Sequence, residues 1–248
     1  MNLLNSCRLM AAARAAAAIF VVLLTGLAAG AQALSVLPVN IQFEHGRTTT
    51  SLTVTNKGTS ETAIQIRAYA WSQKGDDDQL TKTDMVLLSP PLARIAPGAS
   101  QVVRIILRQE PQSREDTYRI LIDQIPPPAE PGVVHMVLRM SIPIFAVPAT
   151  RAFPDVQFHL ERDAGQIYLV AINPGNLHEV VRDIVLTTSD GHKLKPDSSP
   201  LPYILSGATR RWHMVAQDSV PLQSETLQLT AHLDAGPIDE QVRFVAAH

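Results

Sequence analysis

The sequence contains little cysteine, few aromatic residues and almost no net charge. One cysteine among 248 residues excludes a disulfide scaffold and a cysteine-ligated metal site. A formal charge of −2 gives no support to a general nucleic-acid surface. The chain also lacks a G-x-S-x-G elbow and a phosphate-cradling glycine loop. We therefore expect no enzyme, no cofactor and no nucleic-acid partner.

Histidines are the remaining source of metal or acid–base chemistry. All eight are scattered, with no pair at metal-ligand spacing, so we expect surface or edge histidines and no metal site. His178 and Glu179 begin like a zinc-protease helix, but the second histidine is missing and the pattern around them is that of a strand. We expect a turn and the start of a strand there.

A long apolar run is found at the N-terminus. Arg8 and Arg14 precede it, it covers 15–29, and Ala31-Gln32-Ala33 has the small-x-small pattern of a cleavage site. This predicts a signal peptide over residues 1–33, and removing 33 of 248 residues leaves 215. The single cysteine is removed with it. Taking two from the 21 basic residues leaves 19 against 23 acidic ones, a formal charge near −4.

The first half of the remaining chain alternates short β-branched or apolar runs with turns rich in Gly, Pro and Asn. Residues 74–78, which include three adjacent aspartates, are expected to form a solvated loop. The predicted strands are 36–43, 48–56, 63–71, 85–89, 101–107, 118–125 and 133–148. Seven strands at roughly ten-residue spacing are typical of an immunoglobulin-like sandwich.

A second array of strands follows Pro148. Its predicted strands are 156–162, 166–173, 180–188, 210–216, 225–233 and 241–246, and no strand is assigned within 191–202. The fold class is therefore all-β, with an N-terminal immunoglobulin-like domain over 34–148 and a C-terminal β-sandwich domain over 149–248.

The most distinctive stretch of the chain is Val133–Pro148. Because alternate side chains of a strand face opposite sides, it predicts one long strand with one wholly apolar face. That face consists of Val134, Met136, Leu138, Met140, Ile142 and Ile144. Two interpretations fit this pattern. The strand is either buried between two sheets, or it is an edge strand that lends its apolar row to another protein.

Several short motifs match a known family in their order and spacing. They are Val36-x-Pro38, Asn40-Ile41-x-Phe43, Ala68–Trp71, Ser89-Pro90-Pro91, Ala96-Pro97-Gly98, Tyr118-Arg119, Ile125-Pro126-Pro127, Ile142–Pro148 and Ala171–Pro174. With these motifs the chain resembles the PapD-like periplasmic chaperones of the chaperone–usher pilus pathway. It looks closest to their archaic, spore-coat-U-associated branch.

The resemblance implies a periplasmic protein whose two immunoglobulin-like domains form an L with a cleft between them. Such chaperones bind pilus or fimbrial subunits, here spore-coat-U-like ones, that lack their final strand. They supply a strand in trans and deliver the subunit to an outer-membrane usher. By position, the subunit-binding residues implied here are Val134, Met136, Leu138, Met140 and Ile142. Ile142 and Ile144 lie closer to the cleft, and a place in the protein's own core is the alternative for them.

The residues that anchor the subunit terminus depart from the family pattern. Better-studied members use an arginine in the first strand and a lysine late in the long strand, and the corresponding residues here are Asn40 and Pro143. Neither is charged, although Asn40 can donate a hydrogen bond. Arg119 and Arg139 are the candidate cations, and an ordinary ion pair within the domain is the alternative for each.

One different class of function is also compatible with this sequence. A secreted structural or adhesive β-sandwich protein, itself a component of a fibre, would have the same strand pattern and signal peptide.

The exposed apolar edge further favours a homodimer in which each copy of the free protein caps the other.

Overall fold

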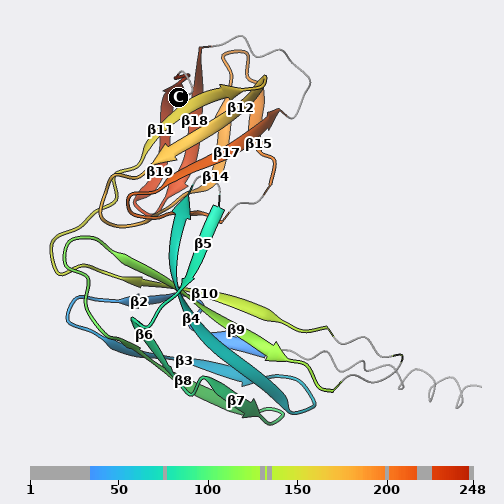
Figure 1. The fold of residues 1–248 in the computed structure, drawn as a ribbon. Coiled ribbons are helices and arrows are strands. Elements are labelled where there is room, and N and C mark those ends of the chain that lie inside the picture. Colours follow the sequence, from blue (N-terminus) through green and yellow to red (C-terminus); the bar gives the residue numbers. More distant parts are fainter. Residues whose placement is uncertain are drawn as a thin grey trace, which may run out of the picture.

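The computed structural model describes residues 34–74, 77–128, 132, 136–198, 201–216 and 225–245. Every regular element in these residues is a β-strand, and the strands form two units (Figure 1). This confirms the predicted all-β class with two immunoglobulin-like domains. The predicted signal peptide lies outside the described residues, and the domain boundaries stay a prediction.

The first domain is a sandwich of two sheets. One sheet has the strand order β1 (Leu34–Leu37), β3 (Thr49–Asn56), β8 (Ser100–Leu107) and β6 (Val86–Ser89). The other has the order β2 (Ile41–Phe43), β10 (Arg139–Ala146), β9 (Asp116–Ile125), β4 (Thr62–Lys74) and β5 (Asp77–Lys82), and β7 (Leu92–Ile95) also pairs with β4. Alternate side chains of both sheets point inward and build one apolar core.

The single first strand predicted over 36–43 is wrong. The chain instead forms β1, which pairs with β3, and β2, which pairs with β10 in the opposite sheet. Pro38 follows β1 directly and has no N–H to continue a ladder, so the chain leaves the first sheet there. This crossing brings the segment just before β2 to the side of β10.

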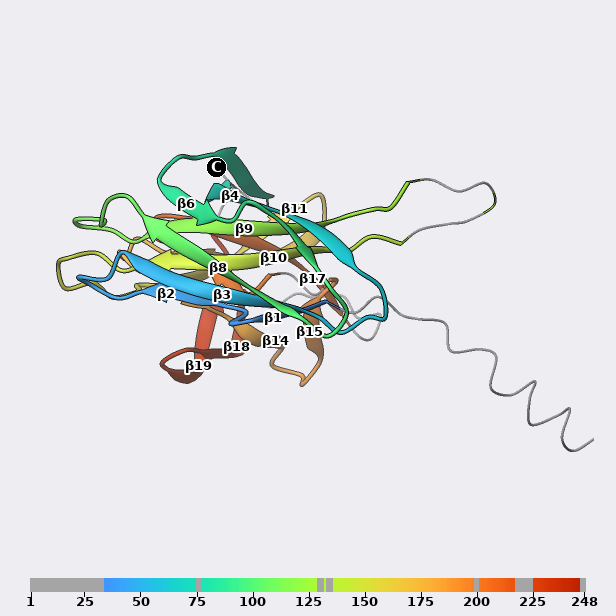
Figure 2. The same ribbon diagram turned by 90° about the horizontal axis from the view of Figure 1, so that it is seen from below.

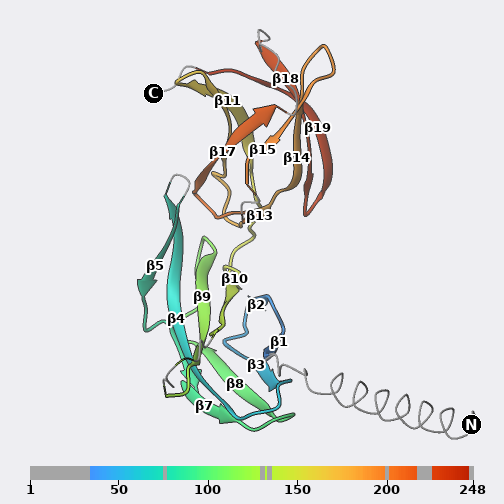
Figure 3. The same cartoon turned by 90° about the vertical axis from the view of Figure 1, so that its right-hand side faces the viewer.

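The solvated loop predicted over 74–78 is also wrong in part. β4 continues to Lys74. β5 begins at Asp77, which pairs with Lys74, and runs back beside β4 as an edge strand. Its charged residues are compatible with a strand because most of β5 faces solvent. Figure 3 shows this hairpin extending from the first domain to the second, where β4 approaches β17 (Thr209–Ala216).

The second domain contains one large sheet and one short strand pair. The large sheet has the order β11 (Gln157–Asp163), β12 (Gln166–Ile172), β17, β15 (Lys193–Pro196), β14 (Arg182–Thr187), β18 (Thr226–Leu233) and β19 (Gly236–Arg243). The short pair is β13 (Glu179–Val180) with β16 (Tyr203–Ile204). β15 falls in the region where no strand was predicted, and β19 begins before the predicted 241.

The two outer strands of the large sheet meet at one point. Leu160 forms a parallel bridge with Phe244, and the N–H of Val245 donates to the Leu160 carbonyl at 2.8 Å. Backbone pairing between Leu160 and the residues that follow β19 therefore covers part of the outer edges of β11 and β19.

The connection between the domains packs on the turn that follows β12. Asn173 is fully buried, and its Nδ2 donates to the carbonyls of Leu177 and Ile204 at 2.8 and 3.0 Å. A Cβ on Gly175 would lie 2.5 Å from the backbone nitrogen of Asp155 and 2.6 Å from the carbonyl of Phe153. Only glycine lets the connection approach this closely.

Candidate functional site

β10 has a strand partner along the whole of one side but along only part of the other. It pairs antiparallel with β9 from Arg139 to Ala146, whereas its parallel pairing with β2 covers only Ile144–Ala146. In the part of the chain that the structure describes, no strand pairs with Arg139–Pro143 on the side away from β9. Figure 2 shows β9, β10 and β2 side by side. We call Arg139–Pro143 the open edge.

The backbone groups of the open edge alternate in direction. The N–H of Gln124 donates to the carbonyl of Leu138 at 2.9 Å, so even-numbered residues of β10 pair with β9. The N–H of Val147 donates to the Phe43 carbonyl at 3.0 Å, so odd-numbered residues face the other way. Arg139 and Ser141 therefore direct their N–H and carbonyl groups to the open edge.

The apolar row leaves the core gradually toward the start of β10. Ile142 and Ile144 are 5% and 0% exposed and belong to the core, Met140 packs against the core, and Leu138 and Met136 are 43% and 89% exposed. Ile142 therefore has the place in the protein's own core that was the stated alternative for it, and its role in binding a subunit stays a prediction. Val134 lies outside the described residues.

The predicted strand over Val133–Pro148 is too long, because β10 begins only at Arg139. Residues 136–138 are described and form no strand. β9 ends at Ile125 and is followed by Pro126–Pro128, which have no N–H groups for a ladder. An extension of β10 to residues before Arg139 would therefore find no N–H donors in the segment that continues β9.

Arg139 is held by an ion pair on the outer face of the sheet. Its Nε hydrogen-bonds to Asp123, and Nη2 of Arg67 donates to the other oxygen of Asp123 at 2.6 Å. Burial alone would raise the pKa of Asp123. The hydrogen bonds from Arg67 and Arg139 outweigh that effect and hold the pKa below its ordinary value. The alternative expected for Arg139, an ion pair within the domain, is the one observed.

Asn40 and Arg119 lie on either side of β10 near the end of the open edge. Asn40 is exposed and directly precedes Ile41, which is in register with Ile144. Arg119 is opposite Pro143 in the β9–β10 ladder. The strand register thus places Asn40 and Arg119, two of the three candidate anchors, at the same position along β10, close to Pro143.

Arg119 is a buried cation with an incomplete set of partners. It is 5% exposed, and its guanidinium lies 3.7 Å from the centroid of the Trp71 ring. Nη1 donates to Ser141 Oγ at 3.4 Å, while Nη2 has no hydrogen-bond partner among the described residues. Burial lowers the pKa of Arg119, and the charge of Asp78 and the nearby Tyr203 partly offset this shift.

Asp78 connects Arg119 to a second arginine, from the other domain. Oδ2 of Asp78 lies 3.7 Å from Arg119 Nη2, and its Oδ1 lies 3.3 Å from Arg210 Nη1. Arg210 is on β17 and is 5% exposed. Sequence reasoning missed this arrangement, because Asp78 was placed in a loop and nothing in the local pattern distinguishes Arg210.

A second pair of side chains, Glu115 and His178, joins the domains at the far end of β10. Glu115 is almost fully buried, and Nδ1 of His178 lies 2.8 Å from its Oε2. The backbone N–H of His178 also donates to this carboxylate at 2.9 Å. The expectation of a surface or edge histidine is therefore wrong for His178, which is 15% exposed and lies between the two domains.

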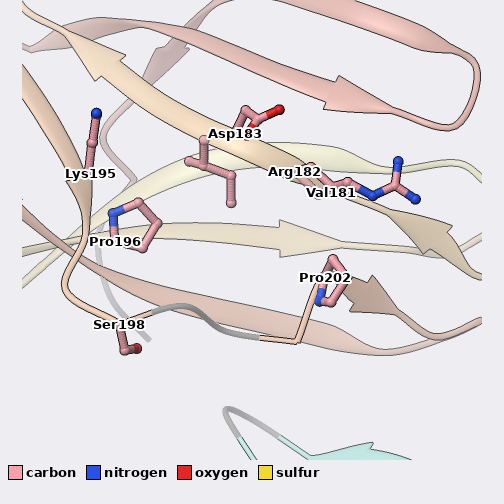
Figure 4. Close-up of a pocket in the computed structure, with 8 residues that line it drawn as sticks. Val181, Arg182, Asp183, Lys195, Pro196, Ser198 and Pro202 are labelled. Atoms are coloured by element: carbon pink, nitrogen blue, oxygen red, sulfur yellow. The ribbon is translucent and has the colours of Figure 1, made fainter. Parts of the chain in front are cut away.

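One hollow of the second domain is lined by several titratable residues, among which His213 Nδ1 lies 2.8 Å from Asp197 Oδ2. Figure 4 shows another hollow of the second domain, in which Arg182 and Lys195 point in different directions. Arg182 forms an ion pair with Asp234, and Oδ2 of Asp183 lies 3.4 Å from His232 Nδ1. No group of His, Cys, Asp and Glu suited to a metal ion occurs among the described residues. Nor do these residues include a helix long and apolar enough to span a membrane.

A model of the family described as pili and flagellar-assembly chaperone, PapD N-terminal domain, matches residues 33–152. The first domain lies within this range and is therefore similar to the PapD chaperones over that length. This confirms the PapD-like resemblance of the sequence. Two curated chaperone proteins each match about half of the chain. The chaperone protein FimB/FhaD of Bordetella pertussis is 30% identical over 137 residues, 51% of this chain and 54% of that protein.

The chaperone protein LpfB of Salmonella typhimurium is likewise 30% identical over 116 residues, 46% of this chain and 47% of that protein. The chain spans about half the length of the curated relatives it matches.

Solved PapD-like structures share the fold over both domains. One is the CsuC–CsuE chaperone–tip adhesion subunit pre-assembly complex from the archaic chaperone–usher Csu pili of Acinetobacter baumannii. The match has a TM-score of 0.64 and 21% identity, and covers 87% of this chain and 100% of that one. The complex of the Salmonella enterica SafA pilin with the SafB chaperone matches with a TM-score of 0.59 and 17% identity, covering 86% and 98%. At these identities the likeness concerns the fold.

Proposed function

We propose that this protein is a periplasmic, non-enzymatic chaperone for pilus or fimbrial subunits. It binds an incomplete subunit by donor-strand complementation and delivers it to an outer-membrane usher. The match of the first domain to the PapD family model, the curated chaperone relatives and structural neighbours that are chaperone–subunit complexes support this function. The predicted signal peptide supports the periplasmic location.

The observation that carries the proposal is the open edge next to exposed apolar side chains. A subunit without its last strand exposes an apolar groove and unpaired backbone groups, both costly in water. Arg139 and Ser141 offer the complementary backbone groups, and Leu138 and Met136 continue the apolar row beyond them. Burying these two apolar side chains contributes about 3–6 kcal/mol before ordering costs.

Of the three candidate anchors, Arg119 best fits the terminal carboxylate of the subunit. It carries a buried charge, its Nη2 has no hydrogen-bond partner among the described residues, and it lies at the end of the open edge. Arg139 already hydrogen-bonds to Asp123, and its side chain is 64% exposed. Asn40 is uncharged and supplies at most a hydrogen bond beside the same position.

The test is capture of a subunit from a periplasmic extract of the source bacterium by the tagged protein. Replacing both Met136 and Leu138 with Glu should abolish capture, because two charges cannot enter an apolar groove. The matched control replaces Leu92 and Val102, both 56% exposed and away from the open edge, with Glu. It adds the same charge and should leave capture intact.

Both double variants should show the circular dichroism spectrum and melting temperature of the wild type, since the replaced residues are exposed. Equal capture by the two double variants would refute the proposed function. Self-association of the purified protein in light scattering, with no captured partner, would instead indicate a fibre component.

A further inference from the structure

The guanidinium of Arg119 lies against two aromatic rings, one from each domain. Its Cζ is 3.7 Å from the centroid of the Trp71 ring on β4 and 5.8 Å from that of the Tyr203 ring on β16. The two rings meet edge to face, with centroids 5.5 Å apart and planes at 87°. Trp71 and Tyr203 therefore form two walls at right angles beside the guanidinium, and we call them the aromatic corner.

The strand register explains why Trp71 lies next to Arg119. Arg119 pairs with Tyr69 in the β4–β9 ladder, and Trp71 is two residues further along β4, on the same face of the sheet. Diagonal neighbours on one face are within reach of aromatic and long side chains. The Thr117 hydroxyl donates to the Trp71 carbonyl at 2.6 Å and so holds the backbone of β4 against β9 at this point.

The polar atom of Trp71 does not account for its place in the structure. Trp71 is 3% exposed, and its Nε1 has no hydrogen-bond partner among the described residues. A buried tryptophan normally pairs its N–H, so the unpaired group costs stability that the ring has to offset. What Trp71 contributes is its ring, which contacts Phe145 and Tyr203 and lies under the guanidinium of Arg119.

The aromatic corner holds the guanidinium beside the open edge. A guanidinium over a ring face keeps the N–H groups in its own plane for hydrogen bonds. Nη1 of Arg119 donates to Oγ of Ser141, a residue of the open edge, at 3.4 Å. Nη2 has no hydrogen-bond partner among the described residues, and Asp78 at 3.7 Å is beyond hydrogen-bond distance. A carboxylate brought by a partner would complete the hydrogen bonds of this group.

We propose that Trp71 and Tyr203 are positioning residues for Arg119, so that both domains build the site for the terminal carboxylate of the subunit. This inference rests on the proposed function. The Trp71 ring supports the guanidinium from the first domain, and the Tyr203 ring confines it from the second. The alternative is that the two rings only pack the domains against each other. The two roles differ in whether the effect of removing a ring depends on Arg119.

The experiment is a double-mutant cycle measured by competition. The subunit recovered with the wild-type protein is co-expressed in limiting amount with equal amounts of two chaperones that carry different tags. Against the wild type, Trp71→Leu should capture about fivefold to tenfold less subunit, because the guanidinium loses the ring that supports it. Against Arg119→Gln, the double variant Trp71→Leu/Arg119→Gln should differ by less than about twofold, since no guanidinium remains to be positioned.

Conservative variants separate the ring from the rest of the side chain. Trp71→Phe keeps a ring face under the guanidinium and should capture within about threefold of the wild type. Tyr203→Phe keeps the ring of the second domain and should compete equally with the wild type. Tyr203→Leu removes that ring and should capture about threefold less, again only when Arg119 is present.

Phe145→Leu is the matched control within the same cluster of rings between the domains. Phe145 is 0% exposed, and its ring contacts are with Trp71, His178 and Tyr203. The variant should lower the melting temperature, as Trp71→Leu does, because both remove buried ring contacts between the domains. It should nevertheless capture as much subunit as the wild type.

An equal loss on Trp71→Leu with and without Arg119 overturns the inference, and so does a similar loss on Phe145→Leu, because the rings then only pack the domains. Unchanged capture by Trp71→Leu overturns it as well. If Trp71→Leu does not fold, the same cycle through Tyr203→Leu decides the question. If neither wild-type nor variant protein recovers any subunit, the proposed function itself has failed.

Discussion

The rings of Phe145 and His178 are stacked, with centroids 3.6 Å apart and planes 10° from parallel. Phe145 is at the end of β10, and His178 belongs to the second domain. The strand that presents the open edge at one end is therefore clamped to the second domain at the other. A subunit that pairs with the open edge meets a fixed arrangement of the two domains.

Replacing His178 with Ala should weaken this clamp. The variant loses the ring stack and leaves the nearly fully buried Glu115 carboxylate without its side-chain partner. We expect the free energy of unfolding in urea to fall by about 2–4 kcal/mol. The control is His45→Ala. The His45 ring is 63% exposed, so this variant should change the free energy of unfolding by less than about 0.5 kcal/mol. Losses of equal size in the two variants would argue against the clamp.

Replacing Arg119 and Arg139 separately with Gln should identify the anchor. Arg119→Gln removes the buried cation at the end of the open edge, so subunit binding should weaken by about tenfold or more. Arg139→Gln removes only a cation already paired with Asp123, so binding should change by less than about threefold. Titration of purified subunit complexes measures both values. The reverse order would assign the anchor to Arg139.

The sequence predicted the fold well where the signal is local. Alternation of apolar residues located most strands, because a buried sheet face repeats every second residue. The same alternation showed which face of the Val133–Pro148 stretch is apolar. It could not show where the row leaves the core, since Ile142 and Met136 look alike in sequence but are 5% and 89% exposed.

The charged part of the candidate site could not be predicted in the same way. Asp78 and Arg210 are 132 residues apart in sequence and meet only because the β4–β5 hairpin reaches the second domain. Three adjacent aspartates are more typical of a solvated loop than of a strand. His178 lacked a metal-ligand partner in sequence, and its actual partner, Glu115, is in the other domain.

The ion pairs of Asp123 should stabilise the first domain in a pH-dependent way. Asp123→Asn should lower the free energy of unfolding by about 1 kcal/mol at neutral pH. Because the folded-state pKa is below its ordinary value, this stabilisation is fully present above about pH 3.9 and is lost as the pH falls through the folded-state pKa. The free energies of unfolding of wild type and variant, measured by urea titration, should therefore become equal in acid.

The matched control for this pH dependence is Asp234→Asn. Asp234 pairs with Arg182, and both side chains are 54% exposed, so removing the charge should have little effect at any pH. A constant difference between wild type and Asp123→Asn from neutral to acid pH would contradict the assignment.

Backbone pairing at the open edge can be tested apart from the apolar row. Ser141 directs its N–H away from β9, so Ser141→Pro deletes a donor for the added strand and leaves the β9–β10 ladder intact. Pro143, two residues on, shows that the same side of β10 accepts proline. We expect the variant to fold but to bind the subunit at least about tenfold more weakly.

Ser141→Thr is the matched control, because it keeps both the N–H and the hydroxyl group that accepts from Arg119. It should bind like the wild type. A proline variant with unchanged binding would show that side chains alone hold the subunit, and the open edge would then have no role in pairing. Met140→Pro provides the opposite comparison: the even-numbered residues pair with β9, so this change should destabilise the first domain itself.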